Sequence, residues 1–155
     1  MKGKNTTQII TGLRVIGLLL ILEAGFMALS LLPSLYYRQG DFFALLFSTL
    51  ITLSVGLLCR IKRVDKQLSI DKRLGISIVA LIWLLIGFFG SLPYLIGGYI
   101  PNIADAVFET LSGLTTTGAT ILSDVESLPK GILFWRSLTH WIGGVGIVVI
   151  VVSFV

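Results

Sequence analysis

The residues with the clearest chemical potential form the run Thr115-Thr116-Thr117-Gly118-Ala119-Thr120. No charged residue occurs from Thr110 to Ser123, so this stretch is too apolar for an ordinary surface loop. Stacked backbone oxygens can replace the water shell of a cation, as they do in potassium filters, and a glycine permits the backbone dihedrals that such a peptide needs. The run therefore predicts a cation filter. The alternative is an external loop beside an interfacial helix.

A short helix is expected immediately before this run. Asn102 can cap a helix that starts at Ile103, and Asp105 places a negative charge in its first turn. The segment Ala104–Leu114 would be about 16 Å long as a helix, roughly half the thickness of the hydrocarbon core of a membrane. We expect it to enter the membrane and stop there, with unpaired carbonyls at its end that stabilise a cation. Thr115–Thr120 would then return outward.

The composition is that of an integral membrane protein. Hydrophobic residues make up 55% of the chain and charged residues 13%, whereas soluble domains carry about 25% charged residues. Cys59 and His140 are the only residues of their types, which excludes an intrachain disulfide and a Cys/His metal cluster. The chain offers no nucleophile–base pair, so we do not expect an enzyme. The net charge of +4 is not interpreted as a signal for nucleic-acid binding.

Four membrane-spanning segments are predicted, since about 20 mostly apolar residues are needed to cross a bilayer. They are Gly12–Leu32, which is interrupted by Glu23, then Phe42–Cys59, a segment within Leu74–Ile100, and Gly131–Val155. The expected fold class is therefore all-α integral membrane, with four transmembrane helices plus one re-entrant pore helix and filter loop. The apolar run at the end of the chain, without a polar terminator, leads us to expect an N-terminal piece of something longer.

The distribution of basic residues predicts the orientation. Six Lys and Arg residues lie in Arg60–Arg73, and Lys2 and Lys4 precede the first span. Cytoplasmic segments carry the excess of Lys and Arg, so both regions are expected in the cytoplasm, with the basic loop near lipid headgroups. The opposite side carries mostly acidic residues, together with Arg38 and Lys130. The Thr-rich run is therefore expected to face the outside.

Several charged residues could support the filter. Glu109, on the short helix, is interpreted as a cation attractor or as a hydrogen-bond acceptor that supports the filter; the alternative is a partly solvated helix residue. Asp105 is interpreted as a helix-start charge rather than an ion ligand. Arg136 and His140 lie one helical turn apart and share a face. For these two, packing against the short helix, or pairing of Arg136 with Glu109, is favoured over a role in tuning the pore.

Other residues are interpreted structurally. Glu23 lies in the middle of a span, where ionisable groups usually face the protein interior; a neutral or paired structural carboxyl is favoured over a proton site. Trp135 and Trp141 suit interfacial anchoring or packing. The run Gly143-Gly144-Val145-Gly146 predicts close helix packing rather than a phosphate-binding loop, because it lies within an apolar span.

Taken together, these motifs resemble the TrkH/KtrB family of bacterial potassium-uptake proteins, and most closely its TrkH branch. The resemblance rests on the segment from Asp105 to Thr120, on Ser127-Leu128-Pro129, on Phe134-Trp135-Arg136 and on Trp141–Ile147. It implies two domains. Residues 1–73 would be an N-terminal two-helix hairpin with its basic cytoplasmic loop. Residues 74–155 would be the first, truncated, helix–pore-helix–helix unit of a four-unit pseudo-symmetric pore.

The resemblance also implies a site and a function. Thr116 and Thr117 would bind potassium through their backbone carbonyls, Gly118 would be the filter glycine, and Thr115 would border the filter. The implied function is potassium uptake across the bacterial inner membrane. The implied partners are membrane lipid, the other three pore units, a second copy in a homodimer and a cytosolic nucleotide-binding subunit of the TrkA type. The alternative is a truncated, non-conducting subunit that associates with a full-length transporter.

The charge bias makes a testable prediction about topology. A reporter fused after Lys66 is expected to lie in the cytoplasm, and one inserted near Asp124 is expected to lie outside. Paired phosphatase and fluorescent-protein fusions measure the two locations. The opposite pattern would overturn the orientation and place the Thr-rich run on the cytoplasmic face.

Overall fold

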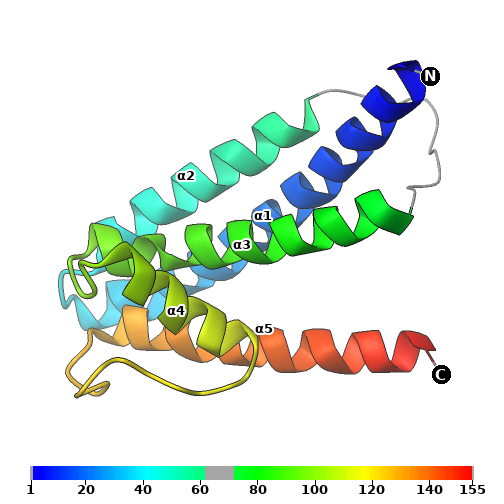
Figure 1. Cartoon of the computed structure of the whole chain (residues 1–155). Helices are drawn as coiled ribbons and strands as arrows, with labels where there is room; N and C mark the ends of the chain where they lie inside the picture. The colour runs from blue at the N-terminus through cyan, green and yellow to red at the C-terminus, as the bar shows by residue number, and fades with distance from the viewer. Residues whose placement is uncertain (1, 62–71, 155) are drawn as a thin grey trace.

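All regular elements that the structure describes are α-helices (Figure 1). The structure is a computed structural model that describes residues 2–61 and 72–154, with side chains for 9–61 and 76–145. The helices are α1 (Lys2–Tyr37), α2 (Phe42–Arg60), α3 (Lys72–Ile96), α4 (Ile103–Leu114) and α5 (Lys130–Phe154). The expected all-α class is therefore confirmed. Most of the basic segment Arg60–Arg73 lies outside the described residues.

Three stretches in the described part of the chain are long and apolar enough to cross a membrane: Ile9–Tyr37, Phe42–Arg60 and Ile76–Ile96. They correspond to the first three predicted spans. The first is longer than the predicted Gly12–Leu32, because α1 continues to Tyr37 with Pro33 in its last turns. The fourth predicted span coincides with α5, whose side chains are described only to residue 145, so its crossing of the membrane stays a prediction.

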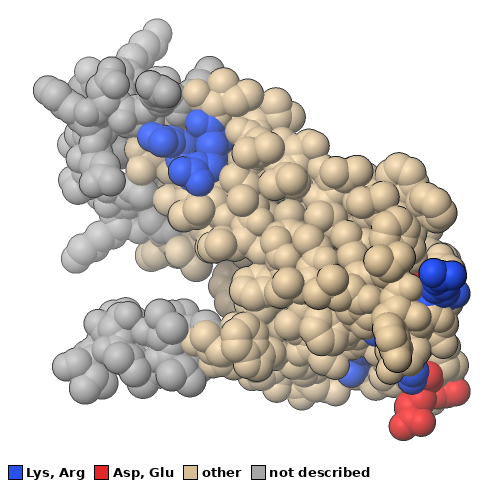
Figure 2. Space-filling view, turned by 180° about the vertical axis from the view of Figure 1, so that it is seen from behind, with Lys and Arg blue, Asp and Glu red and all other residues tan. Residues whose placement is uncertain are grey.

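The surface matches a membrane protein in its charge distribution. On the face shown in Figure 2, a broad uncharged band separates Lys and Arg atoms near one end from Asp and Glu atoms at the other, where further Lys and Arg atoms lie. Large apolar side chains such as Phe47, Leu50 and Leu84 are exposed on the long helices. Bilayer lipid can cover such a surface, whereas soluble proteins rarely expose large apolar patches.

The turns between α1 and α2, between α3 and α4, and before α5 all lie at one end of the bundle (Figure 1). A buried core at this end joins the helices through Met27, Leu45, Tyr94, Ile132 and Trp135. α4 starts here, runs toward the middle of the bundle, and is followed by a loop that returns to the same end (Figure 1). The core therefore fixes both ends of the segment that contains the Thr-rich run.

Two glycines allow α1 and α2 to approach closely. A Cβ atom on Gly17 would lie 2.7 Å from the carbonyl oxygen of Gly56, and one on Gly56 would lie 3.0 Å from the carbonyl oxygen of Gly17. Small residues at such crossings are the usual means by which membrane helices pack backbone to backbone. Gly25, on the same helix, has no atom within 4 Å of its would-be Cβ.

This contrast gives a matched pair of variants. We expect Gly17→Ala to lower the free energy of unfolding by about 1–3 kcal/mol, because the added methyl group meets backbone atoms that cannot rotate away. Gly25→Ala adds the same atom in open space and is expected to change the stability little. Unfolding of the purified protein by heat or by denaturing detergent measures both. Equal stabilities of the two variants would contradict the close crossing.

Candidate functional site

The site begins with α4, which its first residues cap as expected. Asn102 has extended backbone dihedrals, and its Oδ1 accepts hydrogen bonds from the backbone N–H groups of Ala104 (2.8 Å) and Asp105 (3.5 Å). The helix starts at Ile103, as the sequence predicted. Asp105 is exposed in the first turn, where a negative charge favours the positive end of the helix dipole.

The end of α4 is a Schellman motif with a threonine in the left-handed position. The N–H of Thr116 donates to the carbonyl of Gly113 (2.9 Å), and the N–H of Thr117 donates to that of Ser112 (3.0 Å). Thr116 has a φ of 56°, which is uncommon for a β-branched residue. Backbone strain of this kind, of order 1–3 kcal/mol, is found mainly at functional sites.

This motif corrects one expectation about the helix end. We expected unpaired carbonyls there to face a cation. Instead, the carbonyls of Leu111, Ser112 and Gly113 accept hydrogen bonds from the backbone N–H groups of the Thr-rich run. These three carbonyls are therefore paired with the peptide that follows α4, because the tight turn folds that peptide back onto the last turn of the helix.

In the same turn, the backbone N–H groups of the Thr-rich run bond to α4, whereas the backbone carbonyls of Thr116 and Thr117 do not. The N–H groups of residues 115–118 all donate to carbonyls of α4, the last of them from Gly118 (φ of 73°) to Ser112 at 3.4 Å. Among the described residues, no donor reaches the backbone carbonyls of Thr116 and Thr117. Both residues are exposed. Their carbonyl oxygens are therefore available to a ligand.

The threonine hydroxyl groups, in contrast, are partly engaged. The Oγ1 atom of Thr115 lies 2.8 Å from the carbonyl oxygen of Leu111 and 2.8 Å from the Oγ1 atom of Thr117. Thr116 directs its methyl group toward α5, where a Cβ atom on Gly144 would lie 3.9 Å from it. The side chains of Thr115 and Thr117 thus bond to each other and to the helix end, which favours the carbonyls over the hydroxyls as ligands.

A buried carboxylate holds the returning part of the loop. Glu109 is 1% exposed and forms an ion pair with Arg136 of α5, in which Nε lies 2.7 Å from Oε1. Its oxygens also accept hydrogen bonds from the hydroxyl of Thr120 (2.9 Å) and from the N–H of Ile121 (3.1 Å). The expected pairing of Arg136 with Glu109 is therefore present.

One further contact of this loop was not anticipated from the sequence. The hydroxyl of Ser112 donates to the carbonyl of Ala119 at 2.6 Å. Ser112 thus bonds to the loop through both its hydroxyl and its carbonyl, which accepts from Thr117 and Gly118. A hydroxyl residue in the last turn of a helix before a glycine-containing loop was the only available signal, and it is a weak one.

α5 lies directly against the end of α4. A Cβ atom on Gly143 would overlap the carbonyl group of Leu114, and one on Gly113 would overlap the side chain of Thr139. The expectation of close helix packing is thus confirmed at Gly143. His140 shares the face of Arg136 as predicted, and its Nδ1 lies 2.9 Å from the carbonyl oxygen of Arg136.

Three other expectations have mixed outcomes. Trp135 is buried and its Nε1 donates to the carbonyl of Gly90 (2.9 Å), so it packs inside the protein rather than anchoring at a membrane surface. Trp141 is 59% exposed and contacts Phe26 edge to face. Glu23 is buried as expected, but neither of its carboxylate oxygens has a hydrogen-bond partner among the described residues. Of the two expected forms of Glu23, neutral or paired, the paired form is not found among the described residues.

The comparisons with known proteins agree on one family. The family model for TrkH, a cation transport protein, matches residues 42–155. "Trk system potassium uptake protein TrkH" of Halomonas elongata is 39% identical over 142 residues, which cover 91% of this chain and 30% of that protein. Its namesake in Salmonella typhimurium is 41% identical, with coverages of 90% and 29%. The crystal structure of the potassium transporter TrkH from Vibrio parahaemolyticus matches with a TM-score of 0.85 and 38% identity, covering 95% of this chain and 32% of that one.

The ion pair between Glu109 and Arg136 predicts that a conservative substitution of Glu109 lowers the stability of the protein substantially. We expect Glu109→Gln to lower the free energy of unfolding by about 3 kcal/mol, because it leaves the largely buried guanidinium of Arg136 without its counter-charge. Asp105→Asn removes an exposed carboxylate from the same helix and is expected to cost at most about 1 kcal/mol. Denaturation of the purified variants measures both. The double variant Glu109→Gln, Arg136→Gln should cost less than the sum of the single changes; strict additivity would contradict the pairing.

Proposed function

Because the chain belongs to the TrkH family of cation transport proteins, we propose that it forms the N-terminal part of a potassium-uptake protein and supplies one strand of its ion filter. The chain spans about 30% of the length of the relatives reported above. The observation that carries the proposal is the arrangement of the Thr-rich run. Its N–H groups donate to α4, and no donor from the described residues reaches the carbonyls of Thr116 and Thr117.

In the proposed mechanism, potassium loses its water shell and gains backbone oxygens in its place. Thr116 and Thr117 supply these oxygens, and the positive φ angles of Thr116 and Gly118 turn the peptide so that its donors face the helix. The hydrogen bonds to Ser112 and Gly113 keep the strand rigid. A rigid strand offers its carbonyls without first breaking other bonds, which lowers the cost of removing water from the ion.

Glu109 and Arg136 act in this proposal as supporting residues rather than as ion ligands. The carboxylate of Glu109 is buried, and its oxygens already accept from Arg136, Thr120 and Ile121. These contacts join α4 and α5 to the part of the loop that follows the filter. An ion attractor would instead need an exposed oxygen, so the geometry favours the supporting role over the electrostatic one.

One filter strand supplies about a quarter of the oxygens that a dehydrated potassium ion needs, since such ions are surrounded by several carbonyls. The proposal therefore includes three further pore units, in a longer polypeptide, around a common axis. We also propose that the protein lies in the bacterial inner membrane with its N-terminus in the cytoplasm. It would form a homodimer and bind a cytosolic regulatory subunit of the TrkA type. In this arrangement α1 and α2 lie outside the pore, and α1 packs against α3 and α5 of the pore unit.

The backbone mechanism predicts how two conservative changes differ. A Cβ atom on Gly118 meets no atom within 4 Å, so Gly118→Ser fits sterically, but its φ of 73° disfavours any side chain by about 1–2 kcal/mol. We expect Gly118→Ser to displace the carbonyls and reduce the preference for potassium over sodium several-fold. Thr117→Ser keeps the backbone and the hydroxyl, so it is expected to be milder. Competition uptake by the full-length protein, at matched expression in cells, measures both.

A larger effect of Thr117→Ser than of Gly118→Ser on potassium selectivity would contradict the backbone mechanism. If Gly118→Ser left the selectivity unchanged while Thr117→Ser abolished it, the threonine side chains rather than the carbonyls would be the ligands. Membrane insertion of each variant is measured separately, by its yield in the membrane fraction, so that a loss of protein is not read as a loss of selectivity.

A further inference from the structure

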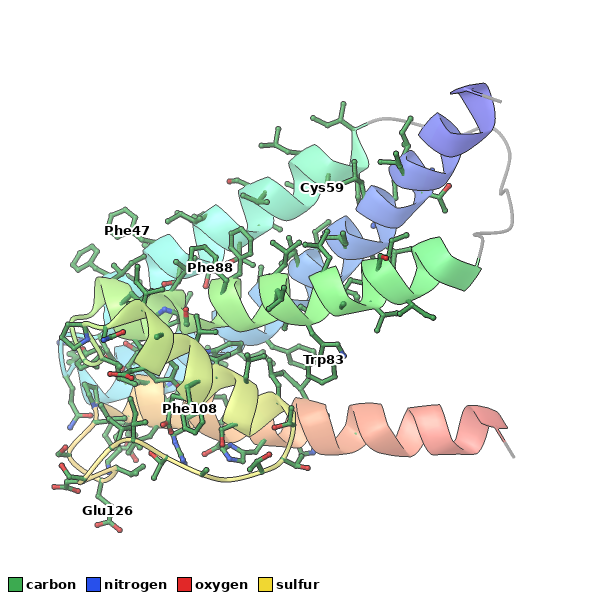
Figure 3. The ribbon with its side chains drawn as sticks, viewed as in Figure 1. Phe47, Cys59, Trp83, Phe88, Phe108 and Glu126 are labelled. Atoms are coloured by element: carbon green, nitrogen blue, oxygen red, sulfur yellow. The ribbon has the colours of Figure 1, made fainter. Side chains whose placement is uncertain are left out.

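Ser112, in the last turn of α4, forms hydrogen bonds with three consecutive residues of the Thr-rich run. Its carbonyl accepts from the N–H groups of Thr117 (3.0 Å) and Gly118 (3.4 Å), and its hydroxyl donates to the carbonyl of Ala119 (2.6 Å). Beyond this point the chain returns beside α4 toward the end of the bundle where Glu126 lies (Figure 3). One residue therefore holds the second half of the Thr-rich run on the helix.

The hydroxyl of Ser112 departs from the usual arrangement in a helix. Serine and threonine hydroxyls inside helices commonly donate to the carbonyl four residues earlier, as those of Ser48, Thr110 and Ser137 do here. The hydroxyl of Ser112 instead reaches a carbonyl seven residues further along the chain. Because Ser112 is buried, its hydroxyl needs a partner inside the protein, and the carbonyl of Ala119 is that partner.

This bond distinguishes one backbone carbonyl from those that precede it in the run. Among the described residues, no donor reaches the carbonyls of residues 115–118. The carbonyl of Ala119 comes next, and it is bonded to α4 through the hydroxyl of Ser112. Ala119 itself is exposed, so its carbonyl has room to turn if that bond is lost. The row of free carbonyls therefore ends at the residue that Ser112 holds.

We propose that Ser112 is a positioning residue that sets the end of the ion filter, because its hydroxyl holds the carbonyl of Ala119 on α4 and out of the ion path. The inference rests on the proposed function and assigns a limit to the same site. The number and position of the coordinating carbonyls determine which cation a filter prefers. A released carbonyl at Ala119 would add an oxygen that no bond holds in place, and it would loosen the backbone of Gly118 beside it.

The test removes the hydroxyl and measures selectivity. In competition uptake by the full-length protein, Ser112→Ala is expected to reduce the preference for potassium over sodium about three- to tenfold, the range that corresponds to one lost hydrogen bond. The control Ser137→Ala removes a hydroxyl that bonds to Leu133 of its own helix and should leave the preference unchanged. An unchanged preference in Ser112→Ala, with selective uptake by the wild type, would overturn this inference alone. A wild type without selective uptake would overturn the proposed function, and this inference with it.

A second pair of variants separates the hydroxyl from the fold and decides the matter if Ser112→Ala does not fold. Ser112→Thr keeps the hydroxyl, and Ser112→Val replaces it with a methyl group, so both add similar bulk to the same site. We expect Ser112→Thr to retain most of the preference for potassium that Ser112→Val loses, when both are compared at equal yield in the membrane fraction. If Ser112 only stabilised the fold, the two variants would differ in yield or thermal stability but not in selectivity. Equal selectivity of the two would therefore overturn the proposal.

Discussion

The loop that follows α4 depends on one buried carboxylate. Glu109 accepts hydrogen bonds from Thr120 and Ile121 and pairs with Arg136, so a single side chain joins α4, α5 and the returning chain. Without it, a loop of exposed threonines and one glycine would have few contacts to define its path. The cost of burying the charge is offset because its oxygens face several donors and an opposite charge. The positions of the carbonyls of Thr116 and Thr117 follow from this constraint at one end of the run and from the Schellman motif at the other.

Much of this arrangement could be predicted from the sequence, because it depends on local signals. Asn102 and Asp105 predict the start of α4, and the apolar runs predict the three helices that are long and apolar enough to cross a membrane. The pairing of Arg136 with Glu109 could be anticipated because each charge lies in an apolar segment, where an unpaired charge is costly. In each case a single residue or a single segment carries the physical reason, so no knowledge of the tertiary packing was needed.

The features that could not be predicted depend on contacts between distant segments. A β-branched residue is disfavoured at positive φ, so local preference argues against the conformation of Thr116, and only the bonds to Ser112 and Gly113 hold it there. Among the described residues Glu23 has no hydrogen-bond partner, because Gly90 and Thr110 pack around its carboxylate, and such packing leaves no pattern in the sequence.

The glycine contact between α1 and α2 also bears on the order in which the protein assembles. Gly17 and Gly56 lie on consecutive helices, so once both helices have formed only the short turn between Tyr37 and Phe42 has to close for them to meet. Helix pairs that are neighbours in the chain can associate as soon as both are in the membrane. The α1–α2 hairpin can thus form during synthesis, before α4 and α5 emerge, and provide a preformed surface of α1 on which the helices around the Thr-rich run then assemble.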